Sequence, residues 1–146
     1  MDKNNVIELS ATKIYQRENL ILSDVNLSVE NGEFLYVIGK VGTGKTSLIK
    51  TLNSELPLIS GYGKVAGFRL ANIKSKEIAH LRRKIGVVFQ DFRLLTDRNV
   101  YNNLAFVLKA TGWKNKAEID NRISEVLTNV GLLNKENKMP HQLSGG

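Results

Sequence analysis

Glycines and a lysine–threonine pair are spaced in this sequence as a phosphate-binding loop requires. The pattern G-x-x-x-x-G-K-[ST] is matched by Gly39, Lys40, Val41, Gly42, Thr43, Gly44, Lys45 and Thr46. Glycine tolerates positive φ angles, so successive backbone N–H groups in such a loop can point at phosphate oxygens. Lys45 offers a charge to the β- and γ-phosphates, the Thr46 hydroxyl a ligand to Mg²⁺, and Ser47 a contact on the α-phosphate side. The spacing predicts binding of a nucleoside triphosphate with Mg²⁺.

The residues on either side of the loop predict the elements that position it. A continuous apolar run at residues 34–38 precedes the loop and is typical of a strand buried on both faces. Helical character follows over residues 46–53, so the positive end of a helix dipole would face the phosphates. A second buried strand is predicted at residues 85–89 by the same kind of apolar run.

The remaining pattern predicts strands first and helices later. Residues 6–9 and 20–29 alternate around a polar turn at 16–19. Gly61, Gly63 and Gly67 interrupt a short strand pattern at 64–68. We predict an α/β protein, with a β-rich and P-loop core over residues 1–90 and a helical subdomain over 91–146.

Three helix starts are predicted from capping residues. Ser75 is expected to cap one helix, Thr96 or Asp97 a second, and Asn115 with Glu118 a third that ends at Gly131. The buried face of the second helix is expected to consist of Val100, Leu104, Val107 and Leu108. That of the third is expected to consist of Ile119, Ile123, Val126, Leu127 and Val130.

Composition excludes several classes of protein. The 146 residues suit one domain, and the absence of cysteine excludes a disulfide framework and a thiolate zinc site. No apolar run reaches the roughly 18 residues of a spanning helix, and no signal-peptide core follows Met1, so we expect a cytoplasmic location. His80 and His141 are expected to be ordinary surface residues.

The net charge of +7 permits an anionic partner. The densest cluster, residues 80–84, has no interleaved aromatic side chains, so no specific nucleic-acid binding is expected. It is either a solvated basic face or, through Arg82, Arg83 and Lys84, a contact with an anionic membrane leaflet.

Further residues resemble the motifs of the ATP-binding-cassette (ABC) ATPases, and they occur in the order that this family has. They are Tyr15 upstream, Gly32-Glu33-Phe34 before the loop, Gln90 after it, and Leu143-Ser144-Gly145-Gly146 at the end of the sequence. The resemblance implies a partial ABC-type nucleotide-binding domain of the P-loop NTPase fold, with an N-terminal antiparallel β part.

The same resemblance implies roles for these residues. Tyr15 would stack on the adenine of ATP, while Gln90 would touch Mg²⁺ or the attacking water and act with Lys45 in catalysis. Ser144, Gly145 and Gly146 would contact the γ-phosphate held by the other subunit of an ATP-bound homodimer.

Within the family, residues 81–106 closely resemble the members that act in bacterial cell division. This implies an integral membrane partner and a peripheral position on the inner face of the cell membrane. Two other readings stay open, namely the ATPase subunit of a lipoprotein-releasing or import transporter, and a non-catalytic nucleotide-binding module.

The sequence ends at Gly146, ahead of the family's Walker B strand, catalytic glutamate and switch histidine. We therefore expect the chain to be a fragment that is poorly stable and does not hydrolyse ATP alone. Without the neighbouring strand, residues 34–38 and 85–89 are expected to expose apolar surface.

Overall fold

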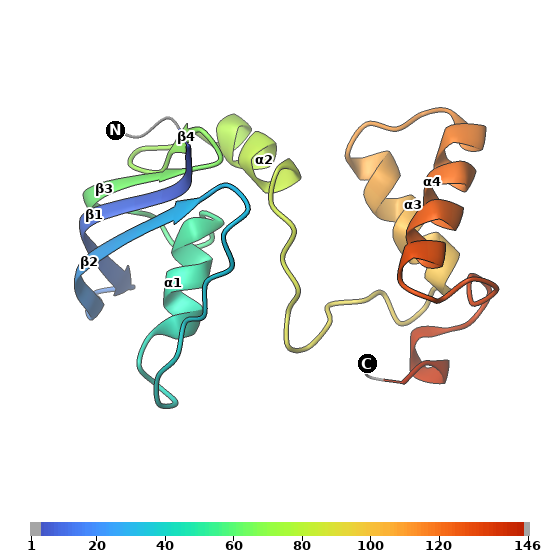
Figure 1. The fold of residues 1–146 in the computed structure, drawn as a ribbon, viewed down its shortest axis with the longest axis horizontal. Helices are drawn as coiled ribbons and strands as arrows, with labels where there is room; N and C mark the ends of the chain where they lie inside the picture. The colour runs from blue at the N-terminus through green and yellow to red at the C-terminus, as the bar shows by residue number, and fades with distance from the viewer. Residues whose placement is uncertain (1–3, 145–146) are drawn as a thin grey trace. The chain divides into compact units, whose positions relative to one another are not determined.

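The computed structural model describes residues 4–144, and the chain divides into two compact units between Val87 and Val88 (Figure 1). The elements of the first unit are β1 (Asn5–Gln16), β2 (Asn19–Glu30), α1 (Lys45–Leu52), β3 (Ser60–Val65), β4 (Phe68–Arg69) and α2 (Ser75–Arg83). The second unit is helical and contains α3 (Val100–Ala110), α4 (Lys116–Asn129) and a short 3₁₀ helix (Pro140–Gln142).

The strands form one antiparallel sheet in the order β2-β1-β3-β4. β1 pairs with β2 on one side and with β3 on the other, which explains why it extends beyond the predicted residues 6–9. Gly61 of β3 lies so close to β1 that a Cβ there would be 2.5 Å from the Ala11 carbonyl oxygen. Only glycine fits at this close approach of β3 to β1.

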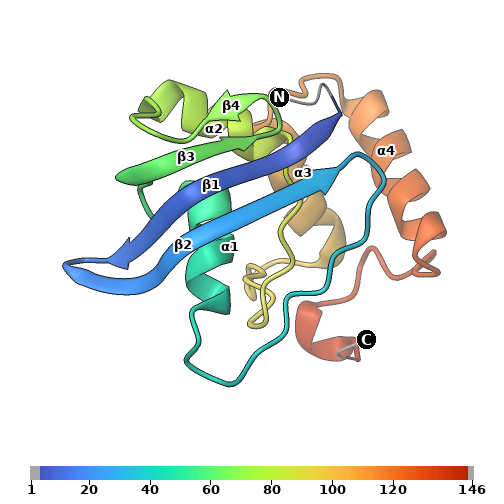
Figure 2. The same cartoon turned by 60° about the vertical axis from the view of Figure 1, so that its left-hand side comes forward.

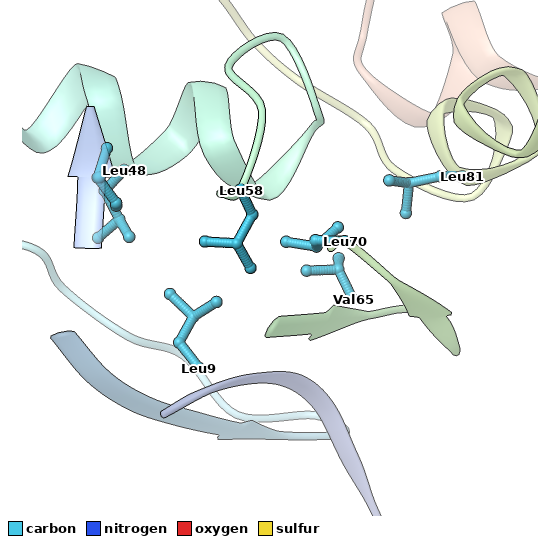
Figure 3. Close-up of a cluster of buried hydrophobic side chains, with 7 residues drawn as sticks. Leu9, Leu48, Leu58, Val65, Leu70 and Leu81 are labelled. Atoms are coloured by element: carbon cyan, nitrogen blue, oxygen red, sulfur yellow. The ribbon is translucent and has the colours of Figure 1, made fainter. Parts of the chain in front are cut away.

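The core of the first unit lies between the sheet and its two helices. α1 lies against one face of the sheet (Figure 2). The buried side chains drawn in Figure 3 come from β1, α1, β3, α2 and the segments between them, and the labelled ones are Leu9, Leu48, Leu58, Val65, Leu70 and Leu81. Leu81 is completely buried, so α2 is fixed to this core.

The two buried strands predicted at residues 34–38 and 85–89 are wrong. Neither segment forms a strand, and the side chains of residues 34–38 are from 42% to 88% exposed. Among the described residues no strand pairs with either segment. Their backbones therefore make no inter-strand hydrogen bonds, and no neighbouring strand covers their side chains. The expected exposure of apolar surface is therefore confirmed, with Val88 94% exposed.

The predicted caps of the first two helices are also wrong. α2 is capped by Lys74, whose N–H donates to the Glu77 carboxylate at 3.0 Å, and Ser75 is already helical. α3 is capped by Asn99, whose side chain accepts from the Asn102 N–H at 2.9 Å. Thr96 and Asp97 lie in a turn, because the Asn103 amide holds the chain at Leu95 through two hydrogen bonds.

The helix α4 begins and ends as predicted. Asn115 accepts hydrogen bonds from the Ala117 and Glu118 N–H groups, and Gly131 follows the helix with a φ of 70°. The core of this unit consists of Ala105, Ile119, Ile123 and Leu127. Val107 and Val130, predicted to be inside, are 56% and 66% exposed, since Val107 faces away from this cluster and Val130 follows the last residue of α4.

A polar contact joins the two long helices of the second unit. The Tyr101 hydroxyl of α3 donates to the Asp120 carboxylate of α4 at 2.5 Å. This hydrogen bond, together with burial and the Asp120 charge, raises the pKa of Tyr101 above its ordinary value of 10.0. Because the raised pKa belongs to the folded state, the contact stabilises the helix pair below pH 10 and is lost as the pH rises through that pKa.

We therefore expect Tyr101→Phe to remove part of the alkaline destabilisation of the helical unit. The wild type should lose stability as the pH rises above about 10, and the variant should lose less, because it has no phenol to ionise. Urea unfolding followed by Trp113 fluorescence at pH 8 and pH 11 measures this difference. Tyr36→Phe, at an exposed position in the first unit, is the control, and equal pH profiles for the two variants would refute the assignment.

Candidate nucleotide-binding site

The candidate site is the loop of residues 39–44 and the first turn of α1. Gly42 and Gly44 have φ angles of 85° and 92°, a conformation that other residues rarely adopt. A Cβ on Gly44 would lie 2.8 Å from Ile21 Cγ2 and 3.0 Å from Leu22 Cγ. The end of the loop is thus seated directly on β2, and this packing fixes where α1 begins.

Gly44 is the N-cap of α1 and offers no side chain to the first N–H groups of the helix. Those groups are left for another acceptor, and the positive end of the helix dipole lies beside them. A phosphate oxygen is a suitable acceptor at such a helix start.

Lys45 places its charge across the loop. The Lys45 ammonium donates to the carbonyl oxygens of Gly39 and Lys40, at 2.7 and 2.8 Å. The Thr43 hydroxyl also donates to the Lys40 carbonyl, at 2.8 Å. The loop is therefore closed on itself by its own donors, with the ammonium held next to the glycine-rich backbone.

The next two residues of α1 differ in accessibility. Thr46 is exposed, so its hydroxyl is open to a cation, and a neutral oxygen of this kind suits Mg²⁺. Ser47 is only 8% exposed, because it lies on the side of α1 that packs inward. The loop and Thr46 together have the donors, the charge and the oxygen ligand that a magnesium-bound triphosphate needs.

The tip of the loop lies in solvent. Lys40 and Val41 are exposed, and Val41 makes no shielding contact at 101% relative exposure. Their exposure agrees with their side chains having no part in holding the loop together.

The other predicted site residues lie in separate parts of the chain. Tyr15 is half-buried near the end of β1, opposite Leu20 of β2. Gln90 and Ser144 are both exposed and belong to the second unit. Gly145 and Gly146 lie outside the described residues. The structure thus assembles the phosphate loop within the first unit, and the roles of Tyr15, Gln90 and Ser144 stay predictions.

Two residues that support the loop were missed by sequence reasoning. Ile21 and Leu22 form the surface on which Gly44 rests. The alternation of residues 20–29 indicated a strand, but nothing in it indicated that the loop would pack on that strand.

Histidine and acidic side chains are dispersed in the part of the chain that the structure describes. In residues 4–144, no group of three or more histidine, cysteine, aspartate or glutamate side chains is placed to hold a metal ion. His80 and His141 are exposed, as expected. None of the described helices has the length and apolar character needed to span a bilayer.

The basic cluster around α2 is partly engaged in packing. Arg82 donates to the carbonyl oxygens of Asn53 and Ser54, at 3.1 and 3.2 Å, and so ties α2 to the end of α1. The Lys84 ammonium lies 5.4 Å from the centre of the Phe68 ring. Structural roles therefore account for two of the charges in this cluster.

The fold resembles solved ATP-binding cassettes. A dimeric cassette in a post-hydrolysis state, bound to ADP and Pi, aligns with a TM-score of 0.79 at 28% identity, over 95% of this chain and 63% of that one. The cassette cbiO1 of Clostridium perfringens, part of an ABC transporter complex, aligns with a TM-score of 0.84 at 25% identity, over 97% and 57%.

Curated relatives agree with this likeness. The cell division ATP-binding protein FtsE of Streptococcus pneumoniae is 41% identical over 97% of this chain and 62% of its own length. The methionine import ATP-binding protein MetN of Helicobacter pylori is 43% identical over 97% of this chain and 43% of its own length. The chain thus spans less than two thirds of either relative. The family model for the ABC transporter matches residues 22–146, and the chain belongs to that family.

Proposed function

We propose that the chain binds MgATP as the nucleotide-binding part of an ABC-type ATPase subunit. The observation that carries this proposal is the glycine loop seated on β2, with Lys45 across it and the exposed Thr46 beside it. Loop N–H groups and the Lys45 ammonium would hold the β- and γ-phosphates, and Tyr15 would stack on the adenine. Mg²⁺, when bound, would neutralise phosphate charge, with Thr46 and Gln90 as its oxygen ligands.

Hydrolysis would need a second copy. In this proposal, Lys45 and Gln90 of one subunit face Ser144, Gly145 and Gly146 of the other across the γ-phosphate of a homodimer. Two observations support it. The sequence contains the Leu143-Ser144-Gly145-Gly146 motif, and a solved relative with ADP and Pi is dimeric.

Magnesium dependence tests the role of Thr46. We expect Mg²⁺ to tighten ATP binding by the wild type. In Thr46→Val this magnesium-induced increase in affinity should be about tenfold smaller, because valine keeps the shape of threonine and removes the oxygen ligand. Calorimetric titration with ATP, in magnesium and in EDTA, measures both values for each protein. Equal affinities in EDTA are the internal control. An unchanged magnesium effect in the variant would contradict this role of Thr46.

We further propose that the subunit acts as FtsE does, in bacterial cell division with an FtsX-like integral membrane partner. The chain would then lie peripherally on the inner face of the cell membrane, and ATP hydrolysis by the intact protein would drive the partner. The identity to FtsE and the close resemblance of residues 81–106 to division proteins support this reading.

An import transporter is the second candidate, because the identity to MetN is as high as that to FtsE. Affinity purification from the native membrane would decide between them. Recovery of an FtsX-like protein favours division, and recovery of an amino-acid permease favours import.

A further inference from the structure

We propose that the corner between α3 and α4, residues 109–118, is a direct contact with an anionic bilayer surface. This inference concerns lipid and does not depend on nucleotide binding by the loop. The corner contains a tryptophan and three lysines that no part of the proposed ATPase site uses. Its connection between the two helices is visible in Figure 1.

The backbone of the corner is held in a defined shape. After α3 ends, Gly112 takes a φ of 106° and donates to the Lys109 carbonyl at 3.0 Å. The Trp113 N–H donates to the Leu108 carbonyl at 3.1 Å. Asn115 then caps α4 through its side chain. Hydrogen bonds thus cap the end of α3 and the start of α4, and Trp113 lies in the short connection whose backbone they hold in place.

The charge of the corner is strongly positive. Lys109, Lys114 and Lys116 are exposed, and Glu118 is the one carboxylate in the same segment. Among the described residues, no ion pair engages any of the three lysines. Their ammonium groups therefore stay available for an anionic partner. Long lysine side chains can also reach lipid phosphate groups while an apolar side chain contacts the membrane interior.

Trp113 distinguishes a bilayer from other anionic partners. Its side chain is 38% exposed, and it lines an open hollow of about 490 Å³ with Lys114, Glu118 and the turn residues. An indole with an apolar body and one N–H suits the headgroup level of a membrane, where tryptophan is enriched. A nucleic acid would favour several aromatic side chains for stacking, and Trp113 is the one aromatic residue in the segment 109–118.

The single tryptophan makes the proposal directly measurable. Vesicles of phosphatidylglycerol and phosphatidylcholine should shift the Trp113 emission to shorter wavelength, and pure phosphatidylcholine vesicles should not. Each lysine near an anionic surface strengthens binding about fivefold, so Lys114→Gln with Lys116→Gln should weaken partitioning about 25-fold. The matched control is Lys135→Gln with Lys138→Gln, which removes the same charge from exposed positions of the same unit.

The outcomes separate lipid contact from its alternatives. A blue shift on anionic vesicles, with the corner variant weakened and the control changed by less than about threefold, supports the proposal. Sedimentation with vesicles without an emission shift, or equal losses in both double variants, overturns it. A shift with polyglutamate but none with vesicles would instead assign the corner to an acidic protein. MgATP titration of the same samples tests the nucleotide site separately.

Discussion

Lys45→Ala should weaken ATP binding by at least about 100-fold, because charge-assisted hydrogen bonds to phosphate contribute about 1.5–3 kcal/mol each. In the folded chain the Lys45 ammonium spans the loop and touches the carbonyl oxygens of Gly39 and Lys40. Phosphates bound in the loop would lie within its reach. Calorimetric titration with MgATP, or competition against a fluorescent ATP analogue, gives the two dissociation constants.

A matched control separates this loss from a general change of charge. Lys50→Ala removes the same charge from the same helix, where Lys50 forms an ion pair with Glu55 at 3.0 Å. Surface ion pairs contribute about 0–1 kcal/mol, so this variant should bind MgATP within about threefold of wild type. Equal losses in the two variants would mean that Lys45 acts only through net charge.

Gly44→Ala should destabilise the first unit by about 2–5 kcal/mol and abolish nucleotide binding at the concentrations that saturate wild type. The positive φ of 92° strains any L-residue by about 1–2 kcal/mol. In addition, the new Cβ would approach Ile21 Cγ2 to 2.8 Å, and overpacking of this kind costs about 1–3 kcal/mol. Urea unfolding followed by far-UV circular dichroism gives the stability, since Trp113 reports on the other unit.

Gly42→Ala is the comparison that isolates the clash. Gly42 has a similar φ of 85°, but a Cβ there meets nothing within 4 Å. Its variant should therefore lose only the strain energy, about 1–2 kcal/mol. If both variants unfolded at the same urea concentration, the packing of the loop on β2 would have no part in its stability.

The phosphate loop could be predicted from the sequence because its chemistry is local. Eight consecutive residues supply the positive φ angles, the ammonium and the hydroxyl, whatever surrounds them. Alternation of apolar side chains is also set within a strand, so the strands at residues 6–9 and 20–29 could be predicted. The short strand predicted at 64–68 is wrong, because these residues cross the turn between β3 and β4. The seating of Gly44 on Ile21 could not be predicted, because it joins residues more than 20 positions apart.

Burial and capping, in contrast, depend on partners elsewhere in the fold. The apolar run at residues 34–38 indicates a buried strand only when another strand lies beside it, and none of the described strands does. Thr96, Asp97 and Asn99 are all competent caps by residue type. The choice of Asn99 follows from the Asn103 amide, which bonds to Leu95 and holds the preceding turn away from the helix.

The exposed apolar run at residues 34–38 has a consequence for the solubility of this 146-residue chain. Its five residues are all apolar or aromatic, carry no charge and include no proline, and the rings of Phe34 and Tyr36 already meet edge to face at 4.8 Å. Exposed segments of this composition add readily to one another as intermolecular strands. We therefore expect the 146-residue chain, when it is concentrated in solution, to aggregate first through this segment.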